Sequence, residues 1–246
     1  MSVSVGSLGT VRARHAGGPD VKGSVVMGQY YAPTIIDQAV APTVRWWFAA
    51  HIYGNGLKLM EHSYVGNRFV RAVESFLRLD GGMRLVWAGD YADKETDGEN
   101  LWQKTLTPNH DDHDYSRCVA ITAGLAPLYP GYESTLNAVV SAAHVVDVPF
   151  ASDDECRYVL NLDTREYVDT TRAPLADPES DWTARIHPLP LLTCEGNTRG
   201  GGDYRSNAPV IGSWARARVG IGGHVPAGFT EVDFAAMLPA EGEILV

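Results

Sequence analysis

The sequence has few cysteines, and they are badly spaced for cross-links or for metal. The 246 residues include 3 cysteines, Cys118, Cys156 and Cys194. Their number is odd and no C-x-x-C pair occurs, so neither a disulfide scaffold nor a cysteine zinc site is expected. A reduced, cytosol-like compartment is the simplest interpretation.

Long apolar runs are also missing. Nowhere do about 18 apolar residues follow one another, as a membrane-spanning helix requires. The N-terminal stretch MSVSVGSLGTVRARHAGGPDVKG carries arginines where a signal peptide needs an apolar core. We therefore expect a soluble, cytoplasmic protein without a membrane partner.

The chain has fewer basic than acidic residues. The chain has 20 Lys and Arg against 30 Asp and Glu, a formal net charge of −10. A protein that wraps nucleic acid by neutralising phosphates needs a basic face, so this function class is not expected. An acidic surface is compatible with a basic protein partner or with a homo-oligomer.

What remains is ordinary globular material, 45% hydrophobic. The best helical pattern lies at 67–79, where Phe69, Val73, Phe76 and Leu77 form one stripe opposite Arg71, Glu74 and Ser75. Asn67 is the expected N-cap, and Gly81 and Gly82 end the helix. A second helix is predicted at 134–146.

Short strands are predicted around these helices. They cover 27–37 as an edge strand because of Pro33, 83–91 as a buried strand, 157–169 as a hairpin, 186–197 and 210–222. The polar segment 92–116 is expected to be a surface excursion. This pattern predicts an α+β fold of short antiparallel strands and hairpins with a few helices.

The chain also contains an internal similarity, which suggests two alike halves. Short matches recur in the same order about 130 residues apart, among them Arg84-Leu85-Val86 with Arg218-Val219-Gly220. We predict a flexible arm or extension at 1–26, a first half at 27–150 and a strand-rich second half at 151–246, with one compact unit as the alternative.

Five segments resemble motifs of a group of bacterial and phage proteins, some of which begin at the methionine of MGQYY. They are MGQYY (27–31), GLKLMEHS (56–63), VWAGDYAD (86–93), LPLLTCEGNTRGGGDY (189–204) and GSWAR (212–216). No activity is established for that group, so the resemblance implies no catalytic residues. It implies that residues 1–26 lie outside the shared unit.

The strongest candidate site is the glycine-rich segment EGNTRGGGDYRS at 195–206. Glycine amides can converge on an anion, and arginines on either side can clamp a phosphate or carboxylate. Neither a Walker G-K-[ST] nor a G-x-G-x-x-G fingerprint is present. The predicted ligand-binding residues are Asn197, Arg199, Gly200, Gly201, Gly202, Asp203, Tyr204 and Arg205. The alternative is a wide hairpin loop with solubilising Arg–Asp pairs.

Acid–base candidates lie elsewhere. Asp90 follows a predicted strand in AGDYAD, Glu61 stands beside His62, and Glu195 opens the glycine-rich segment. Each has a structural alternative as a polar strand end. The segment NHDDHD (109–114) has metal-ligand atoms, but three acids and two histidines on an exposed loop are usually solvated, so no metal site is predicted.

Two interpretations of function stay open, and no cofactor can be named from the sequence. The first is binding of a small anionic ligand, nucleotide-like or phosphate-like, at 195–206, with hydrolysis supported by Glu61, Asp90 or Glu195. The second is a non-enzymatic interaction module of phage or bacterial type, such as a binder, an immunity-type protein or an assembly component. It would use the acidic surface and the N-terminal arm.

Overall fold

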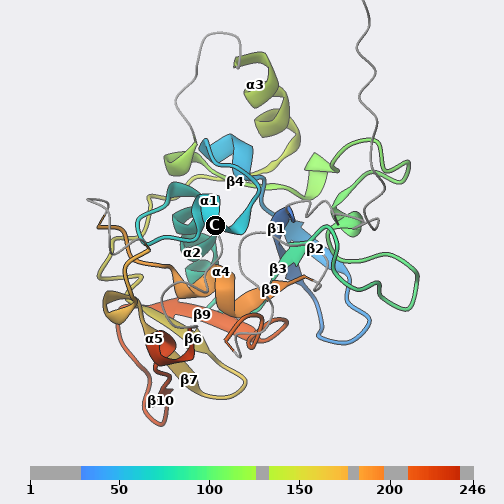
Figure 1. Cartoon of the computed structure of the whole chain (residues 1–246). Helices are drawn as coiled ribbons and strands as arrows, with labels where there is room; N and C mark the ends of the chain where they lie inside the picture. The colour runs from blue at the N-terminus through green and yellow to red at the C-terminus, as the bar shows by residue number, and fades with distance from the viewer. Residues whose placement is uncertain (1–28, 126–132, 177–182, 197–209, 239–246) are drawn as a thin grey trace, which may run out of the picture.

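The computed structural model describes residues 29–125, 133–176, 183–196 and 210–238 (Figure 1). The strands are β1 (Tyr31–Ile36), β2 (Val44–Trp47), β3 (Met83–Gly89), β4 (Val119–Ile121), β5 (His144–Val146), β6 (Tyr158–Asn161), β7 (Glu166–Asp169), β8 (Cys194–Glu195), β9 (Arg218–Gly222) and β10 (Thr230–Glu231). The helices are α1 (Leu59–His62), α2 (Arg68–Leu79), α3 (Glu133–Ala142), α4 (Pro188–Thr193) and α5 (Phe234–Met237). The predicted α+β fold of short strands and few helices is therefore confirmed. The predicted arm at 1–26 lies outside the described residues.

One mixed sheet organises the described part of the chain. Its strand order is β10-β7-β6-β9-β3-β1-β2, and β8 joins β3 beside this path. In residues 27–150, β1 and β2 form a hairpin, and β3 pairs antiparallel with β1. In residues 151–246, β6 and β7 form a hairpin, and β9 pairs antiparallel with β6. The antiparallel pair β3 and β9 then joins the halves, with Arg84 opposite Arg218. The sheet is thus continuous across residue 150, and the predicted duplication stays a prediction.

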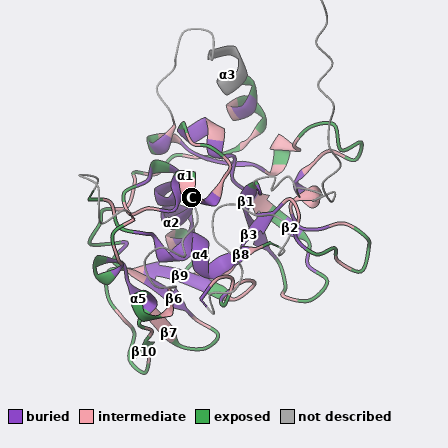
Figure 2. Ribbon diagram, viewed as in Figure 1, coloured by how far each residue is buried: buried purple, intermediate pink, exposed green. Residues whose placement is uncertain are grey.

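The core lies between this sheet and the helices that pack on it. Figure 2 shows the buried residues concentrated along α2, α4, β3 and β9, with exposed residues in the peripheral loops. Phe69, Trp87 and Leu189 are fully buried members of this core. A small parallel pair, β4 with β5, lies with α3 at one end of the molecule, and β6, β7, β10 and α5 lie at the other (Figure 1).

Helix α2 matches its prediction in extent but not in its polar face. Asn67 Oδ1 accepts hydrogen bonds from the Phe69 and Val70 amides at 2.8 and 3.2 Å, so the predicted cap is present. Arg71 and Glu74 are buried, although the helical pattern predicted them on the solvent side. They are covered because His187 Nε2 reaches Glu74 Oε1 at 2.9 Å and Ser152 O accepts from Arg71 Nη1 at 3.0 Å.

Two strand predictions that involve proline were wrong, the edge strand at 27–37 and the strand at 186–197. β1 is an interior strand between β2 and β3. Pro33 is tolerated there because its carbonyl, which accepts from the Phe48 amide at 3.0 Å, points toward the chain just beyond the end of β2. The missing N–H lies on the same side, so it removes no hydrogen bond between β1 and β3. Pro188 and Pro190 begin the helix α4, where the first amides need no intrahelical partner. The predicted strand 186–197 is thus reduced to β8.

The predicted 157–169 hairpin is present as β6 and β7 without a turn glycine. Asn161 Oδ1 accepts from the Asp163 and Thr164 amides at 3.1 and 3.2 Å, and Arg165 takes the left-handed conformation at φ 59°. The other limits shift. The predicted helix 134–146 ends at Ala142 and gives way to β5, and the predicted strand 210–222 is confined to β9.

Candidate functional site

The carboxyl ends of β3 and β8 lie side by side and bring together two of the predicted residues. The strands run parallel, with Trp87 opposite Cys194 and Ala88 opposite Glu195. Asp90 directly follows β3, and Glu195 is the last residue of β8. The two candidates, 105 positions apart in the sequence, therefore end neighbouring strands of one sheet.

Gln29, which the sequence analysis did not single out, lies between these strand ends. A Cβ placed on Gly89 would come within 2.1 Å of Gln29 Nε2, and one on Gly196 within 2.6 Å of Gln29 Oε1. Only glycine at these two positions leaves room for the amide. The signal that could have identified Gln29 is its place in the MGQYY motif.

Of the two polar atoms of the Gln29 side chain, the oxygen has a hydrogen-bond partner among the described residues and the nitrogen has none. Its Oε1 accepts from the Tyr31 hydroxyl at 3.0 Å. The residue is only 2% exposed, and Nε2 has no hydrogen-bond partner among the residues that the structure describes. Ser63 Oγ and Trp102 Nε1 share that condition elsewhere in the described chain. A buried N–H without an acceptor costs about 1–3 kcal/mol, so each such group is a candidate for a ligand or water contact.

Asp90 is the best placed acid of the site. Its Oδ1 accepts from the Tyr30 amide at 3.1 Å, and its own amide donates to the Tyr30 carbonyl at 3.0 Å. Partial burial raises the pKa of the Asp90 carboxyl above its ordinary value. The Tyr30 side chain beside it is 43% exposed. The site thus combines a carboxyl group with reduced acidity and an accessible aromatic ring.

Glu195 is held in an ion pair with Arg216, which comes from the GSWAR motif. Arg216 Nε donates to Glu195 Oε1 at 2.5 Å and Nη2 to Oε2 at 2.9 Å. Nη2 also donates to Glu95 Oε1 at 2.5 Å. These hydrogen bonds, which the guanidinium donates to the two carboxylates, raise the pKa of Arg216. The bridge ties three distant segments together, and it occupies both oxygens of the Glu195 carboxylate.

Glu61 and His62 lie near the start of β1 but face different partners. Glu61 Oε2 accepts from the Lys58 amide at 2.9 Å and so caps the short helix α1. His62 is fully buried, where Trp87 Nε1 donates to its Nε2 at 2.9 Å and its Nδ1 lies 3.2 Å from Gly56 O. Burial lowers the pKa of His62 to about 4. The two side chains are therefore not arranged as an acid–base pair.

The predicted ligand-binding residues Asn197, Arg199, Gly200, Gly201, Gly202, Asp203, Tyr204 and Arg205 lie outside the described residues. Both flanks of that segment are described. Gly196 leaves β8 beside Gln29. On the other flank the Gly212 and Trp214 amides donate to the Leu191 and Leu192 carbonyls at 2.8 and 2.7 Å. The described residues before the segment thus belong to β8, and those after it are bonded to α4.

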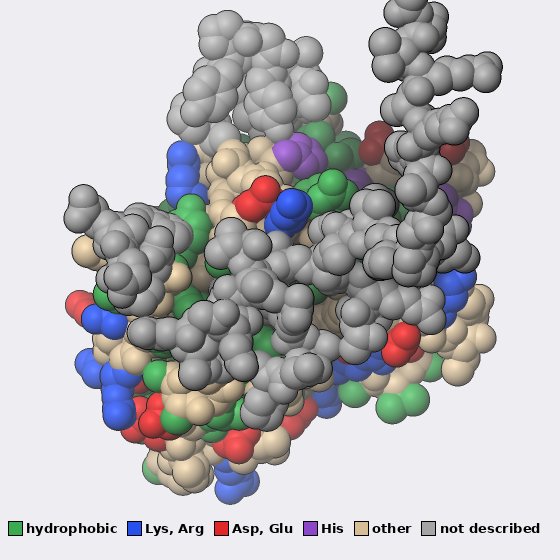
Figure 3. Space-filling view, viewed as in Figure 1, with side chains coloured by type: hydrophobic (Ala, Val, Ile, Leu, Met, Phe, Trp, Pro, Cys, Tyr) green, Lys and Arg blue, Asp and Glu red, His purple; other side chains and the backbone are tan. Residues whose placement is uncertain are grey.

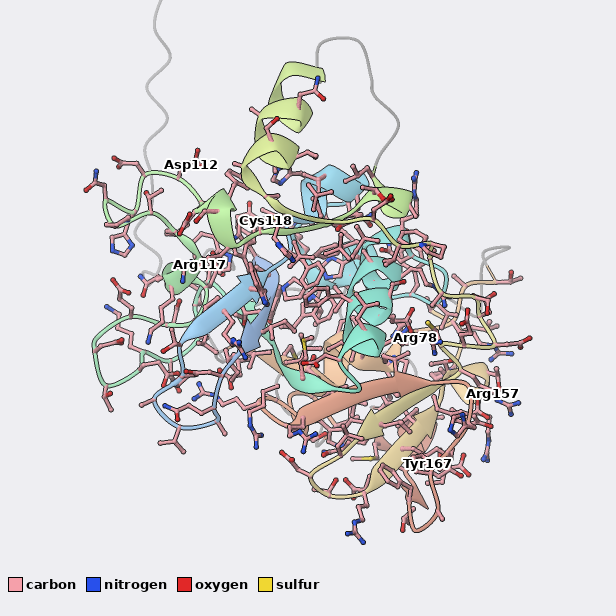
Figure 4. The ribbon with its side chains drawn as sticks, turned by 180° about the vertical axis from the view of Figure 1, so that it is seen from behind. Arg78, Asp112, Arg117, Cys118, Arg157 and Tyr167 are labelled. Carbon is pink, nitrogen blue, oxygen red and sulfur yellow. The ribbon has the colours of Figure 1, made fainter. Side chains whose placement is uncertain are left out.

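The histidines of the segment NHDDHD make other contacts. His113 stacks on Trp47 with ring centroids 4.6 Å apart, while His110 Nε2 meets Glu99 Oε1 at 3.1 Å. Within the described ranges no group of three His, Cys, Asp or Glu side chains could hold a metal ion. Arg117 and Asp112 lie on this side of the molecule, away from Arg78, Arg157 and Tyr167 (Figure 4).

A pocket of about 410 Å³ opens in the predicted excursion 92–116. Its lining includes Glu95, Asp97, Lys104, His110 and Arg117. Lys104 Nζ donates to Asp97 Oδ2 at 2.7 Å, and Arg117 Nη2 donates to the Lys104 carbonyl at 2.8 Å. The pocket's cations are thus already bonded within the chain.

The cysteines are unsuited to nucleophilic chemistry. Burial raises the pKa of Cys118, Cys156 and Cys194 to about 12 in each case. A thiol must ionise to attack, so these three side chains act as small apolar residues. His187 is no partner for Cys194, because its Nδ1 accepts from the Leu189 amide at 3.1 Å and its Nε2 faces Glu74.

No protein-family model, curated protein or solved structure matches this chain. Every helix in the described ranges is too short or too polar to cross a bilayer. The face in Figure 3 carries acidic and basic side chains interspersed over its lower part. The site must therefore be interpreted from its own geometry.

Proposed function

We propose that the protein binds a small molecule through a phosphate-like anionic group at the carboxyl ends of β3 and β8. The observation that carries this proposal is the buried Gln29 Nε2, a donor without a partner in the described chain. An oxygen of the ligand would accept its hydrogen bond and remove the cost of the unpaired N–H.

Neighbouring groups support a ligand of nucleotide-like character. The glycine-rich segment leaves from Gly196 next to the Gln29 amide, and glycine amides can surround an anion there. Arg199 and Arg205 are the cations proposed to complete this contact. The exposed ring of Tyr30 is available for stacking on a planar group.

Turnover is the second part of the proposal. Asp90 is the described carboxyl group best suited to move a proton, because burial raises its pKa toward neutrality. Glu195 is the other acid–base candidate that the sequence offers at this site. Its salt bridge to Arg216 makes a role in holding the site together a better fit. Hydrolysis of a phosphate ester would be measured as phosphate release, and Asp90→Asn is expected to abolish release while binding persists.

The binding proposal is tested by thermal unfolding against a panel of nucleotides and simple phosphates. A ligand at about 100 times its Kd stabilises by about 2.7 kcal/mol, which raises Tm by roughly 5–10 °C for a chain of this size. Gln29→Met should lose this shift while the apo Tm changes little, since loss of the unpaired N–H offsets loss of the bond from the Tyr31 hydroxyl. Gln38→Met, at an exposed glutamine, is the matched control.

Two results would contradict the proposal: the absence of any stabilising phosphate compound, or a full ligand shift in Gln29→Met. The interaction module stays the alternative. Its N-terminal arm lies outside the described residues, and it predicts salt-sensitive partner binding that weakens on deletion of residues 1–26.

A further inference from the structure

A second polar hollow lies at the opposite end of β3, around arginines that the proposed function does not use. It has a volume of about 250 Å³, and its lining includes Arg45, Arg84 and Arg218. These residues come from β2, β3 and β9. Three guanidinium groups therefore line one small hollow, together with the carboxylates of Asp37 and Asp80.

Strand pairing explains why these arginines meet. Arg84 and Arg218 are directly opposite each other in the antiparallel pair of β3 and β9. Like charges in this position repel and weaken a sheet. Arg45 falls where the pairing of β1 with β2 shifts register, between Val44 and Trp46, so the irregularity adds a third cation nearby.

The charge of the hollow is only partly compensated. Arg84 Nη1 donates to Asp163 Oδ2 at 2.8 Å. Asp163 also compensates Arg218, because its Oδ2 accepts from the Arg218 amide at 3.2 Å and the two side-chain charges attract each other. Within the described part of the chain Arg45 forms no salt bridge, and Arg45 and Arg218 are both exposed. The lining also contains Asp37, whose Oδ1 accepts from the Thr43 amide at 2.8 Å, and Asp80 at the end of α2.

The lining also includes apolar residues. Ile35 and Ile36 are 3% exposed, and Trp46 and Met83 are half-buried. A guanidinium fork matches the oxygens of a phosphate or carboxylate, while apolar lining residues suit a hydrocarbon group. The volume is below that of pockets for drug-sized ligands, so the occupant is small.

We propose that this hollow binds a small phosphomonoester with one ring or a short hydrocarbon group, its oxygens held by Arg45, Arg84 and Arg218. The bound anion would add to the compensation that Asp163 already gives to Arg84 and Arg218. This site is separate from the one at Gln29 and does not depend on the proposed function.

The test is isothermal titration calorimetry with phenyl phosphate and with inorganic phosphate. We expect saturable 1:1 binding of phenyl phosphate that is tighter than that of inorganic phosphate. Arg45→Gln and Arg218→Gln should each weaken it roughly tenfold or more, because each removes a charge-assisted contact. Arg165→Gln removes the same charge from an exposed turn and should leave the affinity unchanged.

A folding defect is separated from a binding defect by the apo melting temperature. Arg218→Gln should leave it unchanged or raise it, since the variant removes a like-charge contact. Absence of saturable binding, or an equal loss in Arg165→Gln, would overturn the proposal. Loss in Gln29→Met with full retention in Arg218→Gln would also overturn it, because the phosphate would then occupy the other end of β3.

Discussion

Burial of His62 makes the stability of the fold depend on pH in a defined window. Its pKa of about 4 lies below the ordinary value of 6.5, because the buried ring loses hydration on protonation. Between these values the unfolded chain binds more protons, so stability is present at neutral pH and falls as the pH drops. The share of His62 in this loss is about 2 kcal/mol at pH 5 and about 3 kcal/mol at pH 4.

The replacement His62→Gln isolates this share. A glutamine amide can accept from Trp87 Nε1 and donate toward Gly56 O as the imidazole does, but it does not titrate. Urea unfolding, followed by tryptophan fluorescence, gives the free energy of unfolding at pH 7 and at pH 5. The wild-type protein should lose about 2 kcal/mol more than the variant between these pH values.

A difference measurement is needed because His51 and His113 also have pKa values lowered by burial. Their contributions remain in both proteins and cancel. His224→Gln, at an exposed histidine, should show the wild-type pH dependence. If wild type and His62→Gln lose the same free energy, His62 titrates alike in the folded and unfolded chains, and the reasoning from its burial is wrong.

Two further predictions concern the cap of α2 and the glycine beside Gln29. Asn67→Ala removes two cap contacts and the 2.7 Å bond from Nδ2 to Asn55 Oδ1, so it should cost about 2 kcal/mol in urea unfolding, whereas Asn67→Ser should restore about half. A cost below about 0.5 kcal/mol would count against the cap. Gly89→Ala should cost roughly 1–3 kcal/mol because its Cβ meets Gln29 Nε2 and Glu195 O, while Gly220→Ala, with its nearest neighbour at 3.5 Å, should be neutral or stabilising. Equal costs for the two alanines would show that the space around Gly89 does not matter.

Local patterns in the sequence were enough to predict some elements. The stripe of Phe69, Val73 and Phe76, an Asn cap and a glycine stop identify α2, because all of these signals are short-range. The buried polar side of α2 could not be predicted in this way. Arg71 and Glu74 are covered by segments 81 or more positions away, so their burial is a tertiary effect.

In the candidate site, too, single residues were predictable from local sequence patterns, whereas the contacts between them were not. Asp90 and Glu195 were identified one at a time from polar residues at strand ends. Their adjacency depends on the parallel pairing of β3 with β8, a contact between distant segments that no local pattern encodes. Gln29 was missed because a single glutamine in an apolar strand start carries no signal for chemistry. Its role emerges only from the glycines that make room for it.

The two proposed sites are linked by the way β3 is paired. At its start, Met83 and Arg84 pair with β9 and create the arginine hollow. At its end, Trp87 and Ala88 pair instead with β8 and create the site at Gln29. The six residue steps from Arg84 to Asp90 span about 20 Å of extended chain. This is well beyond the range of about 7–10 Å over which neighbouring substitutions usually couple. Binding at each end should therefore respond only to variants at that end. In the double variant Gln29→Met with Arg218→Gln, each ligand should lose as much affinity as it does in the matching single variant.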